Sequence, residues 1–203
     1  MTALIRALDA GNAGGSVRFS ADVRGRSWGY TAEGTVNLGT EDLRGTVKMP
    51  NETWDLVVLD GRVLAHGAGE EDWIRLDPAD TDESVSLLAQ MLGGLSEVDP
   101  RRVVARIAEA GKLGDHSRKP RPAGEEQYSV DLDLSRLSGQ VLGAPAADTR
   151  PTAYPIDKAE LDAWIDQSDR LTYYNARIRN AAGLLEVSCA YSGWGDAVRI
   201  KAT

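Results

Sequence analysis

The 203-residue chain is poor in the residues that most often carry catalysis. It contains one cysteine, Cys189, and two histidines, His66 and His116. A single thiol cannot form an internal disulfide, and the two histidines and one cysteine are too scattered for a zinc site. Ser84 and Ser86 lack the Gly-x-Ser-x-Gly surroundings of a hydrolase nucleophile. We therefore expect no enzyme activity, no metal and no cofactor, and we interpret Cys189 as a small buried hydrophobic residue.

Basic residues are also scarce, with 23 Lys and Arg against 31 Asp and Glu, and the formal net charge is -8. Nucleic-acid binding needs a basic face that displaces counterions, so nucleic acid is excluded as a partner. No apolar run is long enough to span a bilayer. With 42% hydrophobic and 27% charged residues, the composition is that of a globular chain, and the length predicts one domain over residues 1–203.

Apolar and polar residues alternate through the first third of the chain, which is typical of strands with one buried face. The Asp60-Gly61 dipeptide lies between two apolar segments and is a strong signal for a two-residue hairpin turn. These features predict a meander of antiparallel strands. The residues expected on its inward face are Val17, Phe19, Ala21 and Val23; Trp28, Tyr30, Ala32, Gly34, Val36 and Leu38; Leu43, Gly45, Val47 and Met49; and Trp54, Leu56 and Val58.

Helical periodicity replaces alternation in the middle of the chain. Apolar residues at helical spacing between Val85 and Leu95 predict one helix, and Asp99-Pro100 predicts the start of another that ends near Gly111. Further strands are expected at 128–134, 161–165, 171–178, 184–191 and 197–202, with a loop over 139–155 and a short N-terminal helix near residues 4–8. Strands, then helices, then strands indicate an α+β fold with helices gathered on one face of an antiparallel sheet.

The inward face carries little bulk. Ala21, Ala32, Gly34 and Gly45 are small, and the chain has a single phenylalanine. Since protein interiors pack at nearly crystalline density, such a face belongs either to a tightly collapsed sheet or to the wall of a cavity that holds a ligand. The residues alone leave both alternatives open.

Three segments follow one another in an order that is more specific than any of them alone. Segment 56–64 combines a strand, the Asp60-Gly61 turn and a returning strand, with Trp73 beyond it. Residues 150–171 contain a strand pair, and 191–200 places Trp194-Gly195 before an alternating segment, as in a closing hairpin. Together they resemble the mycobacterial lipoproteins of the LppX and LprG type, which are distantly similar to the LolA and LolB lipoprotein carriers, over nearly the whole chain.

The resemblance implies a strongly curved antiparallel half-barrel with helices covering its concave face and an apolar cavity between them. It also implies an extracytoplasmic protein whose full-length precursor is lipid-anchored. The signal peptide and the lipobox cysteine that such a precursor carries are not present in this sequence. The inward strand residues and the apolar helix residues are then the candidate lining of the pocket: Phe19, Tyr30, Val36, Trp54, Leu56, Val58, Leu88, Met91, Leu92, Val104 and Ile107.

The leading hypothesis is a non-enzymatic, monomeric envelope lipoprotein that binds or transports a lipid, a glycolipid or another apolar ligand. Burial of an acyl chain would supply its affinity. The alternative is a tethered interaction or scaffold module with a filled core, acting through its surface on a membrane or a cell-wall assembly partner. His116, Arg118, Lys119 and Arg121 form a basic loop that could meet anionic head groups, and we interpret it as a solvated loop.

Overall fold

The computed structural model describes residues 14–26, 29–60, 62–69, 71–77, 85, 88–89, 95, 98–113, 119–120, 124–133, 156–180, 183–198 and 200. Several sequence predictions lie outside these ranges: the N-terminal helix near 4–8, the 139–155 loop, and the residues Met91, Leu92, His116, Arg118 and Arg121. Within the described ranges, no helix is long and apolar enough to cross a membrane.

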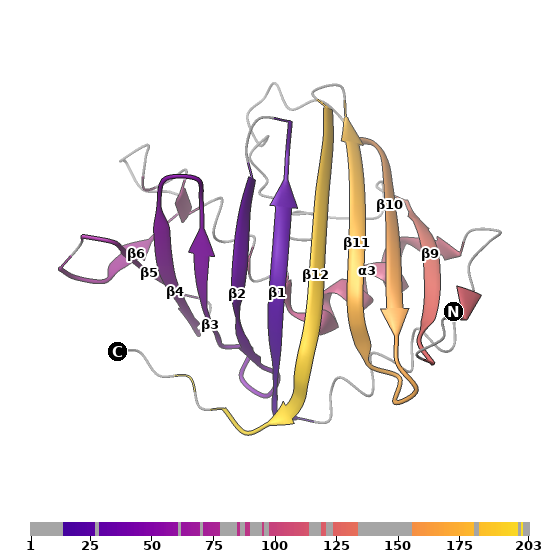
Figure 1. Cartoon of the computed structure of the whole chain (residues 1–203), viewed down its shortest axis with the longest axis horizontal. Helices are drawn as coiled ribbons and strands as arrows, with labels where there is room; N and C mark the ends of the chain where they lie inside the picture. The colour runs from indigo at the N-terminus through magenta and orange to yellow at the C-terminus, as the bar shows by residue number, and fades with distance from the viewer. Residues whose placement is uncertain are drawn as a thin grey trace.

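In the described part of the chain, twelve strands form one antiparallel sheet, which is open because its edge strands β6 and β7 do not pair with each other (Figure 1). The order across the sheet is β6-β5-β4-β3-β2-β1-β12-β11-β10-β9-β7, with β8 also paired to β9. The strands are β1 (Ser16–Arg24), β2 (Gly29–Asn37), β3 (Leu43–Lys48), β4 (Thr53–Leu59), β5 (Arg62–Gly67), β6 (Ile74–Leu76), β7 (Gly111–Leu113), β8 (Lys119–Pro120), β9 (Glu126–Leu132), β10 (Ile156–Ile165), β11 (Leu171–Asn180) and β12 (Gly183–Asp196). The predicted antiparallel sheet is thus confirmed, while its curvature into a half-barrel and its coverage by helices stay predictions.

The alternating residues of the first third of the chain form consecutive strands, as predicted. In β1, Val17, Phe19, Ala21 and Val23 are all buried, and Arg18, Ser20 and Arg24 are exposed. The β4–β5 hairpin turns where predicted: Leu59 pairs with Arg62, and Asp60 has a φ of 49°. This positive φ is the conformation that such a turn requires at its first central position.

The helix α3 (Pro100–Ala110) begins and ends where the sequence predicts. The Asp99 side chain accepts a hydrogen bond from the Arg101 backbone N–H at 2.9 Å, and Pro100 occupies the first turn, where no backbone donor is needed. Gly111 follows the helix in an extended conformation. Upstream, Val85, Leu88 and Ala89 have helical backbone, in agreement with the helix predicted there.

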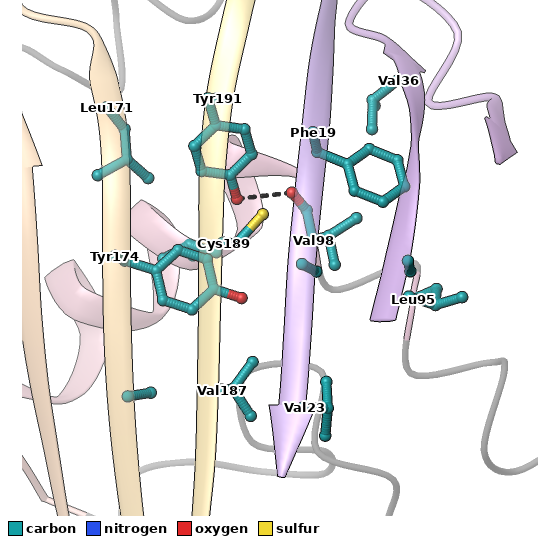
Figure 2. Close-up of a cluster of buried hydrophobic side chains, with 14 of the residues drawn as sticks. Phe19, Val23, Val36, Leu95, Val98, Leu171, Tyr174, Val187, Cys189 and Tyr191 are labelled. Carbon is teal, nitrogen blue, oxygen red and sulfur yellow. Dashed lines mark hydrogen bonds between the residues drawn. The ribbon is translucent and has the colours of Figure 1, made fainter. Parts of the chain in front are cut away.

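The core lies between one face of the sheet, here called the core face, and α3, which passes behind β12, β11 and β10 in Figure 1. Val103, Val104 and Ile107 of α3 are buried in the same apolar cluster as Phe19 and Tyr174. The Tyr191 hydroxyl donates a hydrogen bond to the Val98 carbonyl oxygen at 2.7 Å, which joins β12 to the segment before α3 (Figure 2).

The predicted closing hairpin is wrong. Trp194 and Gly195 lie inside β12, which continues through Asp196, and the described residues Ala197, Val198 and Ile200 are not in a strand. The chain does not turn at Trp194-Gly195 because β1 is long enough to pair with this part of β12. The last residues of β12 pair with the first residues of β1, as far as Asp196 opposite Ser16. Without this pairing, one side of that part of β1 would have no backbone partner.

Candidate functional site

A cleft of about 610 Å³ lies where the β2–β3 and β4–β5 turns, the end of β6 and the start of α3 meet. The sheet order brings these segments together, because β2 to β6 are successive neighbours with every second turn at the same end. The cleft, here called the turn-end cleft, is lined by Val36, Thr40, Glu41, Leu43, Val58, Asp60, Arg62, Val63, Arg75, Leu76, Asp77, Ala89, Asp99 and Arg102.

The floor of the turn-end cleft is apolar. Val36, Leu43, Val58, Leu76 and Ala89 are buried members of the core cluster, and Val63 packs against it half-buried. The cleft therefore ends on the hydrophobic core itself. A ligand that enters it can remove apolar surface from water on both partners.

The rim of the cleft is charged with both signs. Arg102 forms an ion pair with Glu41 at 3.2 Å, and both side chains are largely exposed. Arg62 and Arg75 also line the cleft and form no ion pair within the described ranges, and their strand positions, opposite Leu59 and Leu64, belong to the face away from the core. The rim thus surrounds an apolar floor with groups that bind a polar or charged head.

A partly buried ion pair fixes the start of α3 beside the cleft. The Arg101 guanidinium contacts the Asp99 carboxylate at 2.6 Å and also donates to the Leu38 carbonyl oxygen. The hydrogen bond to Asp99 raises the pKa of Arg101, so that this guanidinium stays charged. The interaction ties the first turn of α3 to the end of β2 and holds one wall of the cleft in place.

The predicted pocket residues divide among several places. Val36 and Val58 line the turn-end cleft. The others are distributed as follows: Phe19, Tyr30, Leu56, Val104 and Ile107 are buried in the core cluster, Trp54 and Leu88 pack half-buried against it, and Met91 and Leu92 lie outside the described residues. The structure therefore brings two of the predicted residues to a cleft and places five in the packed interior.

Two aromatic rings occupy the space left by small inward residues. A Cβ built on Gly34 would lie 2.9 Å from Cε1 of Phe19, and one on Gly45 would lie 3.4 Å from its Cζ. Likewise, a Cβ on Gly67 would lie 2.9 Å from the Trp54 ring. At these positions the sheet is filled by its own side chains, as the collapsed alternative requires.

Sequence reasoning missed the charged rim. The charged residues of the rim belong to four separate segments, each with the composition of an ordinary solvated turn or helix surface: Glu41, Arg62, Arg75 and Arg102. Only the strand order places them together. The one available signal was their position next to the ends of predicted strands and of α3.

The residues considered for catalysis or metal binding in the sequence lie apart in the described ranges. The His66 ring packs 5.5 Å from the ring of Trp73, centroid to centroid, and no three His, Cys, Asp or Glu side chains of the described ranges gather closely enough to hold a metal. Residues 25–29 spell Gly-Arg-Ser-Trp-Gly, a match in letters to the nucleophile motif. Gly25 follows the end of β1 and Gly29 begins β2, however, whereas the motif works at a strand-to-helix turn.

No protein-family model matches the chain, and no curated protein matches it by sequence. Among solved structures, MucB is similar with a TM-score of 0.46 and 13% identity, covering 98% of this chain and 60% of MucB. MucB in complex with MucA(peri) gives 0.40 and 12%, covering 95% of this chain and 55% of that chain. The hypothetical protein CT021 from Chlamydia trachomatis gives 0.33 and 6%, covering 91% and 93%. The chain thus spans less than two thirds of the length of MucB.

Proposed function

We propose that the chain is a non-enzymatic binding protein of the cell envelope that holds an amphiphilic, lipid-like molecule. The apolar part of the ligand lies on the floor of the turn-end cleft, and its polar head meets the charged rim. The observation that carries the proposal is the combination of a core-cluster floor with charged residues of both signs along the same cleft. The envelope location and the lipid anchor of the full-length precursor belong to the proposal and rest on the resemblance to the LppX and LprG lipoproteins.

Burial gives this binding a measurable signature. Each methylene that leaves water for an apolar site contributes about 0.8 kcal/mol, which is roughly a fourfold change in Kd. Because Asp60 and Asp77 line the cleft together with Arg102, the rim complements a zwitterionic head better than a purely anionic one. Alkylphosphocholines of stepwise increasing tail length, kept below their micelle concentrations, are therefore suitable probes.

The test is calorimetric titration of the protein with this series. We expect Kd to fall about fourfold per added methylene and then to level off once the tail exceeds the cleft. Val63→Trp fills the cleft from its half-buried wall and should abolish binding. Leu64→Trp is the matched control, because the neighbouring residue of β5 points to the other face of the sheet and should leave binding unchanged.

The proposal fails if the folded protein binds no member of the series, or if Val63→Trp and Leu64→Trp weaken binding equally. Circular dichroism of each variant separates a filled cleft from an unfolded chain. Native mass spectrometry of protein made in an actinobacterial host with its own signal then identifies any bound lipid.

A second candidate is a tethered interaction module that acts through its surface. The filling of the sheet by Phe19 over Gly34 and Gly45 favours it, because a packed interior leaves less room for a cargo. A lipid-free native mass together with a lack of alkylphosphocholine binding would support this module over the lipid carrier.

A further inference from the structure

A second hollow lies on the opposite face of the sheet, away from α3 and from the turn-end cleft. It has a volume of about 520 Å³ and crosses β10, β11 and β12. Its lining combines the aromatic residues Trp164 and Tyr173 with Asn175, Arg177 and Glu186. We propose that this hollow, here called the opposite-face groove, is a saccharide-binding site, independent of the proposed lipid function.

The groove is built by strand register. Trp164 pairs with Tyr173 across β10 and β11, and Asp162 pairs with Asn175 in the next row that points to this face. The third row joins Arg177 to Glu186 of β12. Aromatic side chains therefore lie at one end of the groove, with planar polar and charged side chains beside them.

The aromatic end is preorganised. The rings of Trp164 and Tyr173 meet edge to face with centroids 4.9 Å apart, a favourable geometry for an aromatic pair. Trp164 is only 7% exposed although it lies on the face away from the main core. The buried Trp164 thus supports the more exposed Tyr173, whose ring can meet the C–H face of a sugar.

At the polar end of the opposite-face groove, the protein itself satisfies only some of the hydrogen-bonding groups. Asp162 accepts hydrogen bonds from Ser129 Oγ and, at 3.2 Å, from Arg177 Nη2. By contrast, Asn175 Oδ1 is buried with no donor among the described residues, and Glu186 makes no hydrogen bond to them. A buried acceptor without a donor is unfavourable, so donors supplied by a ligand are favourable here.

The mixture of groups selects the ligand class. Sugar hydroxyls both donate and accept hydrogen bonds, which suits the acceptors Asn175 and Glu186 beside the donor Arg177. A purely apolar ligand would desolvate these charges without compensation. Three carboxylates, of Glu125, Asp162 and Glu186, disfavour an anion, and a simple cation would leave the donors of Arg177 unused. A neutral saccharide uses all three kinds of group.

The experiment is a ¹H–¹⁵N NMR titration of the whole chain with the methyl glycosides of mannose, glucose, galactose and arabinose, and separately with spermidine. We expect at least one glycoside to shift the Trp164 indole and Asn175 side-chain signals. Tyr173→Ala should weaken that binding by up to about tenfold, because it removes one ring contact, whereas Tyr173→Phe keeps the ring and should bind nearly normally.

Two controls make the result specific. Thr31→Ala changes an exposed β2 residue of the same face outside the groove and should not affect binding. Val63→Trp should also leave glycoside binding intact, which separates this proposal from the lipid function. The inference is overturned if no glycoside shifts the groove signals of the folded protein, if spermidine alone does so, or if Tyr173→Ala binds as the wild type does.

Discussion

The hydrogen bond between Tyr191 and Val98 should be a main tie between the sheet and the helical segment. Tyr191 is 6% exposed and Val98 2% exposed, and the hydroxyl lies 2.7 Å from the carbonyl oxygen that it meets. Tyr191→Phe keeps the ring and its packing on Tyr174, 6.2 Å away between centroids, but leaves the buried carbonyl without this donor. We expect the free energy of unfolding to fall by about 1–3 kcal/mol.

Chemical denaturation measures this change as a lower midpoint at an unchanged slope. In a thermal scan, the same loss lowers Tm by about 2–4 °C for each kcal/mol in a chain of this size. Tyr173→Phe is the matched control, because it removes a hydroxyl from the opposite face and should change stability by less than about 0.5 kcal/mol. Equal effects of the two substitutions would refute the assigned role of the Tyr191 hydroxyl.

Three further predictions concern stability. Burial raises the pKa of Cys189 from 9.0 to about 12, so the thiol of the unfolded chain ionises first. The stability that the neutral buried thiol contributes is fully present below pH 9 and falls between pH 9 and 12 by about 1.4 kcal/mol per pH unit. Tm-versus-pH curves should therefore decline less steeply in Cys189→Ala than in the wild type. Asp99→Ala should cost about 2–3 kcal/mol in urea unfolding, because it removes a helix cap and leaves the partly buried Arg101 charge without its partner. Asp99→Asn keeps a cap acceptor and should cost less; the reverse order would contradict this account. Gly34→Ala would place a Cβ 2.3 Å from the Arg44 carbonyl oxygen, so we expect a loss of at least about 3 kcal/mol or no folded protein, and a normal Tm would show that the strands move apart freely.

Most of the strands were predictable because their signals are local. Alternation in β1 to β4 follows from burial of one face, and the Asp60 turn and the Asp99-Pro100 helix start depend only on neighbouring residues. The Trp194-Gly195 prediction failed for a non-local reason. Whether Gly193 and Gly195, which have φ values of 63° and 88°, reverse the chain or only distort a strand depends on the partner strand, β1, at the other end of the sequence.

The candidate sites were less predictable than the strands. The turn-end cleft needs the strand order, and the opposite-face groove needs the register that puts Trp164 beside Tyr173. A signal for the groove was nevertheless present. Leu161, Ala163 and Ile165 are the alternate residues of β10 that face the core. Trp164 lies between two of them in sequence, so alternation predicts that this large aromatic side chain lies on the face away from the core.

The pairing of β1 with β12 determines how the molecule responds to force. Ser16 and Asp196 lie opposite each other, 180 residues apart in sequence, at the same end of two antiparallel strands. A load applied through the two chain ends would therefore act on this ladder one rung at a time, from that end inward, instead of shearing all rungs together. Under tension, the β1–β12 pair at the centre of the sheet should therefore separate first, which leaves an antiparallel meander on each side.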